Sequence, residues 1–317
     1  MKYIGIDVGG TAIKAGLVDE KGNIIVKDSI TTKARESYEI LSADIAEFAK
    51  KIALKGGCTL DEVESIGIGC PGAIDHENGV VIYANNLNLL NAPLGKTISE
   101  LTGRPVYLGN DANCAALGEF FALNNDEVQN FIAITLGTGV GGGIIINKHI
   151  FTGSNGIAGE LGHILIKADG ESCTCGRKGC WEAYASATAL IRQTERAGAE
   201  NPDSLVAKLI EENGGKGSGK TAFIAARRGD ATGQMVVDNY TRYVAEGLID
   251  VINIFQPDAI VIGGGVSKEG EGLINPVRDY VKKYFYGNFS NIKKTEIRLA
   301  QLGNDAGIVG AALLGIK

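Results

Sequence analysis

The sequence contains the same pattern twice, and this duplication constrains the fold more than any other feature. Near the N-terminus, YIGIDVGGTAIKAGLVDEKGNII alternates apolar and polar residues as strands do, with turns at Gly9-Gly10 and at residues 21–23. A second stretch, FIAITLGTGVGGGIIINKHIFTG, has the same layout of strand, Gly/Thr turn, strand, turn and strand. Asp7 and Thr135 occupy matching places in the two copies. The repeat predicts a duplicated architecture of two related halves that hold one ligand between them.

The glycine turns of this pattern are candidates for binding phosphate. Consecutive N–H groups in such a turn can cradle phosphate oxygens, and Asp7 at the end of the first strand is placed to hold a hydrated Mg²⁺ beside them. One Gly-Gly-Thr turn alone is more often a plain hairpin, and it matches neither the P-loop nor the dinucleotide pattern. The stretch GGKGSGK lacks a preceding apolar strand, so we expect a surface turn there.

Residues 159–182, GELGHILIKADGESCTCGRKGCWE, concentrate potential metal ligands. Cys173, Cys175 and Cys180 follow His163 and complete a Cys₃His set for tetrahedral zinc. Four protein ligands leave no open position, so the spacing predicts a structural metal. A redox cluster or chance proximity is the alternative, but clustered cysteines without a secretory signal favour metal over disulfides.

Asn110 and Asp111 lie where the apolar strand RPVYLG meets the helix-like run ANCAALGEFF. Chemistry in α/β proteins tends to lie at the carboxyl ends of strands, although an Asp here could equally cap the helix. The same tetrapeptide recurs as Gly303-Asn304-Asp305-Ala306, again between a strand and a helix. Capping explains both copies, so the residues alone make neither aspartate catalytic.

Composition limits the partners that the chain can have. The 317 residues carry a net charge of −6, and the pI is 5.3, which gives a nucleic-acid partner no electrostatic support. No apolar run approaches the ~20 residues that a membrane span needs. The first strand begins at residue 2, which leaves no room for a signal peptide or a preceding module. We therefore expect a soluble cytoplasmic protein that binds neither nucleic acid nor membrane.

Taken together, these motifs resemble those of the ROK sugar kinases over essentially the whole chain. The elements DVGGT, GNDAN, LGTGVGGG, GELGH, CTCGRKGCWE and IVIGGG occur in that family's order and spacing, and the cysteine segment with its upstream ExGH is the most specific. The resemblance implies an α/β, actin-like (ribonuclease H-like) duplicated fold, with two domains around a central cleft. We expect a small N-terminal domain at 1–113, joined by the C-terminal helix 304–317, and a large domain at 114–303 that carries the zinc loop.

The resemblance also implies the roles of the site residues. Asp111 resembles the family's catalytic base, which takes a proton from a sugar hydroxyl as that hydroxyl attacks the γ-phosphate of ATP. Asn110, Asp111, Glu160, His163 and Glu182 correspond to its sugar ligands, with His163 shared between sugar and zinc. The ATP-binding residues would be Asp7 near Mg²⁺, Gly9, Gly10, Thr11, Gly137, Thr138 and Gly139 at the phosphates, and Gly264 and Gly265 at the nucleoside. Asp305 is left as a helix cap.

The activity implied is ATP-dependent phosphorylation of a hexose, with glucose first and fructose, mannose, allose or N-acetylmannosamine as alternatives. Cofactors would be ATP, Mg²⁺ and a structural Zn²⁺, and homo-oligomers (dimers or tetramers) are common in the family. A second class within the family is a sugar-sensing repressor, but that class needs a DNA-binding segment before the first strand. An actin-like ATPase without a small acceptor leaves Glu160, Glu182 and the zinc loop unexplained.

Overall fold

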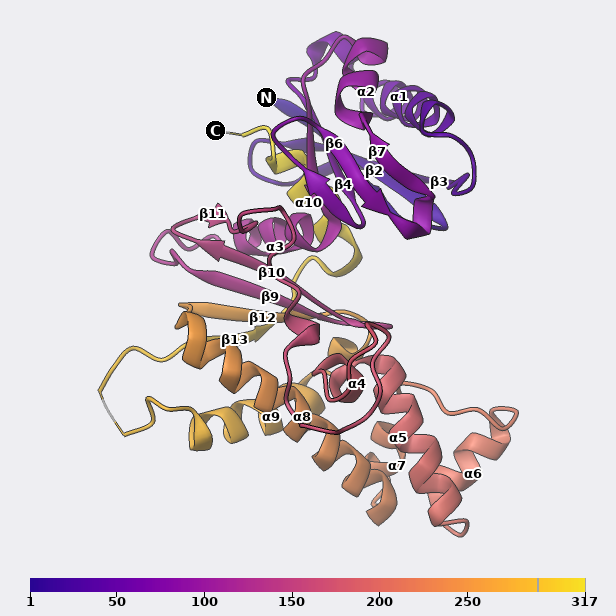
Figure 1. Ribbon diagram of the computed structural model, residues 1–317, viewed down its shortest axis with the longest axis vertical. Coiled ribbons are helices and arrows are strands. Elements are labelled where there is room, and N and C mark those ends of the chain that lie inside the picture. The colour runs from indigo at the N-terminus through magenta and orange to yellow at the C-terminus, as the bar shows by residue number, and fades with distance from the viewer. Residues whose placement is uncertain (290, 317) are drawn as a thin grey trace. The chain divides into compact units, whose positions relative to one another are not determined.

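The computed structural model describes residues 1–289 and 291–316 and divides into two compact units (Figure 1). The first unit comprises Met1–Glu127, Gly143–Gly159 and Gln301–Lys317, and the second comprises Val128–Gly142 and Glu160–Ala300. The last residue of the C-terminal helix expected at 304–317 lies outside the described residues.

A five-stranded sheet in the order β3-β2-β1-β4-β8 organises the first unit. Its strands are β1 (Lys2–Val8), β2 (Ala12–Asp19), β3 (Ile24–Thr31), β4 (Ile66–Cys70) and β8 (Val106–Asn110). The first three strands pair antiparallel, as the alternating pattern predicts, while β1, β4 and β8 run parallel. Parallel strands end at one edge of a sheet, so Asp7, Cys70 and Asn110 lie close to that edge.

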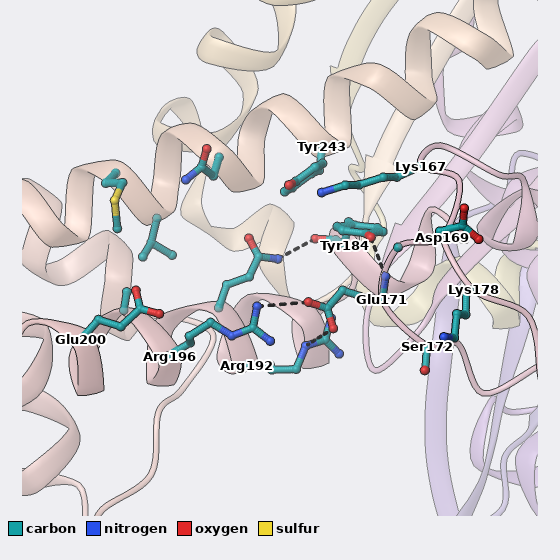
Figure 2. Close-up of a pocket in the computed structure, with 16 residues that line it drawn as sticks. Lys167, Asp169, Glu171, Ser172, Lys178, Tyr184, Arg192, Arg196, Glu200 and Tyr243 are labelled. Atoms are coloured by element: carbon teal, nitrogen blue, oxygen red, sulfur yellow. Dashed lines mark hydrogen bonds and ion pairs between the residues drawn. The ribbon is translucent and has the colours of Figure 1, made fainter.

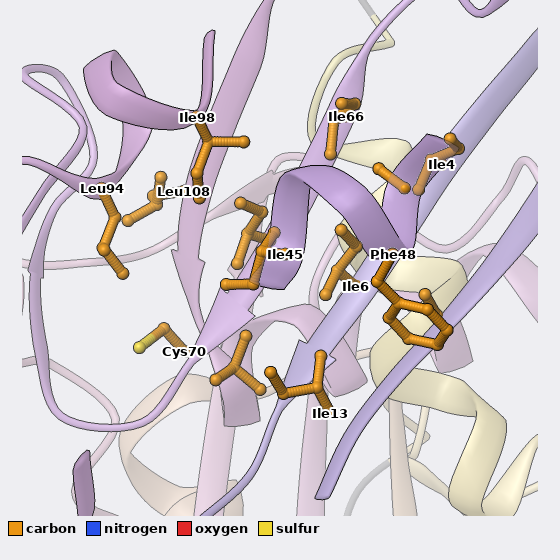
Figure 3. Packing of buried hydrophobic residues seen from close by; sticks show 14 of the residues in the cluster. Ile4, Ile6, Ile13, Ile45, Phe48, Ile66, Cys70, Leu94, Ile98 and Leu108 are labelled. Atoms are coloured by element: carbon orange, nitrogen blue, oxygen red, sulfur yellow. The ribbon is translucent and has the colours of Figure 1, made fainter. Parts of the chain in front are cut away.

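One face of this sheet is covered by α1 (Tyr38–Lys55) and α2 (Leu94–Thr102). The apolar residues of α1 recur at helical spacing, so they form one stripe that faces the sheet. Figure 3 shows Ile45 and Phe48 of this stripe among Ile4, Ile6 and Ile66 of the strands. All five side chains are almost fully buried, which makes this layer the main core of the unit.

The other face packs against α10 (Ala306–Leu313), which in turn packs against α3 (Asp111–Ala122). Contact is close because glycine replaces larger residues: a Cβ at Gly5 would overlap the carbonyl of Ile308, and one at Gly310 would overlap the carbonyl of Cys114. This packing keeps α3 within the first unit, whereas the sequence analysis placed the domain boundary at residue 113.

A small antiparallel sheet completes the first unit together with short helical turns. Its strands are β5 (Ala73–Asp75), β6 (Val80–Ala84) and β7 (Leu89–Ala92). The turns are η1 (Leu60–Glu62), η2 (Asn85–Leu87) and η5 (Gly303–Asp305).

The second five-stranded sheet has the order β11-β10-β9-β12-β13 and repeats the topology of the first. Its strands are β9 (Phe131–Leu136), β10 (Val140–Ile146), β11 (His149–Ile150), β12 (Ala259–Gly263) and β13 (Glu296–Leu299). As in the first sheet, three consecutive strands lie side by side, and two later strands continue the sheet in parallel from the first of them. Of this sheet, β11 and the part of β10 from Gly143 onward belong to the first unit, and the other strands belong to the second. The duplication read from the two hairpins therefore extends to both sheets.

Helices make up most of the rest of the second unit (Figure 1). They are α4 (Glu182–Ala185), α5 (Ala187–Glu200), α6 (Leu205–Glu212), α7 (Thr221–Arg227), α8 (Ala231–Phe255) and α9 (Glu271–Tyr284), with the turns η3 (Leu161–His163) and η4 (Val266–Glu269). The GGKGSGK stretch connects α6 to α7 and follows no strand, in agreement with the surface turn expected there. Among the described residues, no helix combines the length and apolar character needed to cross a membrane.

Candidate functional site

In the first unit, the strand–turn–strand segment around Asp7 is firmly held. Asp7 lies opposite Lys14 in the β1–β2 register, and the Lys14 ammonium lies 3.3 Å from Oδ2 of Asp7. The turn between the two strands is closed by the Gly9 N–H, which donates to the Ala12 carbonyl at 3.0 Å. Thr32 fixes the same turn from β3's end by donating its hydroxyl to the Gly9 carbonyl at 2.7 Å. The backbone at Gly9, Gly10 and Thr11 is thus presented by a rigid hairpin.

Asn110 and Asp111 lie at the junction of β8 with α3. Asn110 is the N-cap of α3, because its Oδ1 accepts hydrogen bonds from the N–H groups of Ala112 and Asn113 at 2.9 and 3.2 Å. Its Nδ2 donates to the Gly72 carbonyl at 3.1 Å. Asp111 is the first residue of the helix, where the positive end of the helix dipole favours its ionised form. Asn110 rather than Asp111 is therefore the N-cap of α3, and Asp111 Oδ1 accepts the Ala112 N–H at 2.9 Å within the first turn.

The repeated aspartate, Asp305, is used differently. It precedes α10, but its carboxylate binds the Lys27 ammonium, with distances of 2.6 and 2.8 Å to its two oxygens. No side-chain capping bond is formed at this end of α10 within the described chain. Asp305 thus occupies the N-cap position predicted for it, but its carboxylate binds Lys27 of β3 instead of the helix N–H groups.

Two buried cysteines lie beneath the aspartates of the first unit. Burial, together with repulsion from Asp111 and Asp7, raises the pKa of Cys70 to about 12, and the same causes raise the pKa of Cys114. Both thiols therefore stay neutral and pack as small apolar groups. Asp7 pairs with Gly69 in the β1–β4 register, and a Cβ at Gly69 would lie 3.7 Å from Cα of Asp111, so the two aspartates share this edge of the sheet.

In the second unit, His163, Cys173, Cys175 and Cys180 come together as predicted. Their ligand atoms all lie within 4.8 Å of one another. Sγ of Cys173 is 3.6 Å from Nδ1 of His163, and the Sγ atoms of Cys175 and Cys180 are 3.6 Å apart. Tetrahedral zinc with bonds of about 2.3 Å to sulfur separates its thiolates by roughly 3.8 Å, so the two 3.6 Å pairs match a zinc site and the remaining ligand atoms lie close to that spacing.

The loop that carries the three cysteines folds back on itself and is held by two isolated antiparallel β-bridges. Isolated bridges pair Leu165 with Cys180 and Ser172 with Lys178. Within the turn, the Cys173 N–H donates to the Arg177 carbonyl at 2.9 Å. Gly179 has a φ of 82°, and a Cβ there would overlap the Lys167 carbonyl, so only glycine suits this position. Backbone geometry thus brings the thiols together.

The three polar residues predicted beside this cluster are arranged around it. Nε2 of His163, the nitrogen opposite Cys173, lies 3.9 Å from Oε2 of the exposed Glu160. Glu182 begins α4, and its Oε1 accepts the Thr174 hydroxyl at 3.1 Å. Its Oε2 accepts the Val140 N–H at 3.1 Å. Glu182 therefore connects the cysteine loop to the glycine turn after β9, a connection that the sequence analysis did not foresee.

The glycine turns of the second unit lie at one edge of its sheet, because β9 and β12 run in parallel and end side by side. Gly137–Gly139 is anchored by the Gly137 carbonyl, which accepts the Ala187 N–H at 2.7 Å. After β12, Gly264 has a φ of 88°, and a Cβ there would press on the backbone of Leu136. Gly265 is exposed, and a Cβ there would meet nothing within 4 Å among the described atoms, so a ligand could approach its backbone closely.

The structure also assigns partners that sequence reasoning missed. Lys14 neutralises part of the Asp7 charge, and the signal for it was available, since a hairpin closed at Gly9-Gly10 pairs these two positions. Glu119 is 4% exposed and binds three backbone N–H groups, those of Gln301, Leu302 and Gly303. No local signal marks Glu119, because its partners lie more than 180 residues away.

Comparison with known proteins gives a consistent result. The ROK family pattern matches residues 3–317. A glucokinase of Halalkalibacterium halodurans is 38% identical over 313 residues, which cover 98% of this chain and 94% of that protein. A xylose repressor of Caldicellulosiruptor bescii is 31% identical over 325 residues, which cover 99% of this chain and 78% of that protein. Among solved structures, a ROK family glucokinase from Streptomyces griseus in complex with glucose and AMPPNP has a TM-score of 0.80, with 37% identity and 99% of each chain covered.

Proposed function

The chain belongs to the ROK family, and we propose from this that it is an ATP-dependent hexokinase that converts glucose to glucose 6-phosphate. The observation that carries the proposal is the full-length similarity, in sequence and structure, to a glucokinase solved with glucose and AMPPNP. The family resemblance and the actin-like α/β fold expected from the motifs are both confirmed by these matches.

Asp111 is proposed as the general base. The sugar hydroxyl oxygen attacks the γ-phosphorus, the bond from that phosphorus to the β–γ bridging oxygen breaks, and ADP leaves. Asp111 accepts the hydroxyl proton, a contribution that is typically ~10²–10⁴-fold. Its position as the first residue of α3 supports the role, since an ionised carboxylate can accept the proton without prior activation.

Backbone and hydroxyl donors are proposed to stabilise the charge that develops on the phosphates. Gly9, Gly10 and Thr11 would contribute from the first unit, and Gly137, Thr138 and Gly139 from the second, while Gly264 and Gly265 would line the nucleoside. Asp7 suits Mg²⁺, which is commonly held by one or two carboxylates plus substrate phosphates. When bound, Mg²⁺ would neutralise phosphate charge, and Lys14 beside Asp7 would supply a further cation.

Asn110, Glu160, His163 and Glu182 are proposed as the sugar ligands, and zinc as the group that fixes the cysteine loop. With Nδ1 of His163 directed at the cysteines, Nε2 carries the proton and donates to a sugar hydroxyl. Glu182 already accepts three hydrogen bonds, from the Val140 N–H, the Thr174 hydroxyl and the Cys173 thiol, but a carboxylate has about four acceptor sites and can bind a hydroxyl as well. A sugar bound there would form hydrogen bonds with side chains that the cysteine loop holds in place.

We propose the cytoplasm as the site of the reaction. None of the six cysteines, all of which the structure describes, forms a disulfide, which suits a reducing compartment better than an oxidising one.

A coupled ADP-release assay across a panel of hexoses and N-acetylhexosamines tests the proposal. Glucose should give the highest kcat/KM, and a higher value for fructose, mannose, allose or N-acetylmannosamine would reassign the substrate. Binding of a sugar with no ADP release from any of them would instead favour a sensor, the class suggested by the xylose repressor match.

A further inference from the structure

A cavity of about 690 Å³ lies on the second unit, between α5, α8 and the loop 167–178 (Figure 2). We call it the α5–α8 cavity. It shares no residue with the Cys₃His cluster, the glycine turns or the proposed sugar ligands. Its volume falls within the range of small-molecule sites, about 300–1,000 Å³. The proposed reaction gives it no role.

Cationic side chains from two elements line this cavity without full neutralisation. Glu171 lies between two guanidinium groups, with Arg196 Nη1 at 3.1 Å and Arg192 Nε at 3.9 Å, as the dashed lines in Figure 2 mark. One carboxylate therefore faces two positive charges. Lys167 and Lys178 line the same cavity, and neither pairs with a carboxylate in the part of the chain that the structure describes. Arg and Lys groups of this kind bind phosphate through charge-assisted hydrogen bonds.

Other lining residues are suited to hydroxyl groups. Asn239 offers an amide donor and acceptor, while Asp169 and Glu200 offer carboxylate acceptors. A bare anion would be repelled by these two carboxylates, whereas a polyol would donate hydrogen bonds to them. The rings of Tyr184 and Tyr243, with centroids 4.7 Å apart, provide an aromatic wall beside these groups.

From these two sets of groups we propose that the α5–α8 cavity binds a small phosphorylated polyhydroxy compound, such as a sugar phosphate. The phosphate pairs with Arg196 and Lys178, and the hydroxyls bind Asn239 and the carboxylates. Because Glu171 belongs to the loop that carries the cysteines, a phosphate at Arg196 competes with an anchor of that loop. The Glu171 N–H donates to Tyr184 Oη at 2.6 Å, and its carbonyl accepts the Gly179 N–H at 2.8 Å, so the loop keeps these backbone contacts when the carboxylate is displaced.

Isothermal titration calorimetry of the full chain with glucose 6-phosphate tests the proposal. Saturating glucose and a non-hydrolysable ATP analogue keep the proposed reaction site filled, so that bound sugar phosphate reports the cavity alone. We expect one equivalent to bind, with at least a tenfold loss of affinity in Arg196→Gln and in Lys178→Gln. Lys208→Gln, an exposed lysine on α6 outside the cavity, serves as the matched control and should bind as the parent does.

Two further ligands distinguish binding of the phosphate group from binding of the hydroxyl groups. Inorganic phosphate should bind more weakly than glucose 6-phosphate, and sorbitol should not bind measurably. Absence of binding at millimolar glucose 6-phosphate, or unchanged affinity in both variants, would overturn the site. Equal affinities for phosphate and glucose 6-phosphate would overturn the hydroxyl recognition. None of these outcomes depends on catalysis. The binding site in the cavity and the kinase activity can therefore be contradicted independently of each other.

Discussion

Glu119 offers a sharp test of how the first unit holds its C-terminal segment. Its buried carboxylate accepts the N–H groups of Gln301, Leu302 and Gly303 at 2.8, 2.9 and 3.2 Å, with the last two on the same oxygen, Oε1. This segment leads into α10, where Gly307 packs against the side chain of Asp7. The substitution Glu119→Gln keeps the shape of the side chain but replaces one acceptor oxygen with a donor.

The expected cost follows from the three bonds. Hydrogen bonds to charged groups are worth about 1.5–3 kcal/mol each, and neutral ones about 1 kcal/mol. Glu119→Gln loses the bond to Gln301 and reduces the other two to neutral strength, and hydration of the exposed loop returns part of that loss. The net cost is about 3 kcal/mol, which corresponds to roughly 100-fold faster local opening.

Hydrogen–deuterium exchange of peptides that contain residues 301–303 measures this opening directly. Glu47→Gln, an exposed glutamate on α1, is the control and should change stability by less than about 0.5 kcal/mol. If the exchange rate of these amides in Glu119→Gln stayed within threefold of the parent rate, the prediction would be wrong. The buried carboxylate would then contribute almost nothing to holding residues 301–303.

The remaining predictions concern the second unit. Purified protein should contain about one zinc per chain, and chelation should shift the emission of Trp181, the single tryptophan, to longer wavelength, because Trp181 is fully buried next to Cys180; an apoprotein with unchanged emission would contradict the structural role of the metal. Burial opposes ionisation of Asp258, but hydrogen bonds from the Lys293 ammonium and the Asn130 N–H outweigh it and lower its pKa. Its stabilising contribution is therefore full above the unfolded pKa of about 3.9 and is lost as pH falls through the lower folded pKa. Asp258→Asn should be less stable than the parent near pH 7, and urea titrations should show this difference shrinking towards pH 3; a difference independent of pH would contradict it.

Local sequence patterns predicted the features whose partners are close in the chain. The two hairpins could be read because alternation and glycine turns are local, and their repetition indicated both sheets. The cysteine cluster could be read because all four ligands lie within 18 positions, from His163 to Cys180. In both cases the geometry is fixed by short segments, so little depends on the rest of the fold.

Features that depend on distant partners were missed or misassigned. Asp305 was expected to cap a helix, but Lys27, 278 positions away, binds its carboxylate. No local pattern indicated that α3 belongs to the first unit either, since that follows from close packing against α10 at the far end of the chain. The α5–α8 cavity combines two helices with the cysteine loop, and no single segment contains enough of its lining to reveal it.

The proposed phosphorylation of glucose with Asp111 as the base can be tested by comparing the parent protein with a single variant. ADP release should be measured for the parent and for Asp111→Asn at saturating glucose and ATP, with glucose binding followed separately by calorimetry. We predict that kcat falls at least ~100-fold in Asp111→Asn while glucose still binds within about tenfold of the parent affinity. Substantial turnover by Asp111→Asn, or no glucose-dependent ADP release by the parent, would contradict the account.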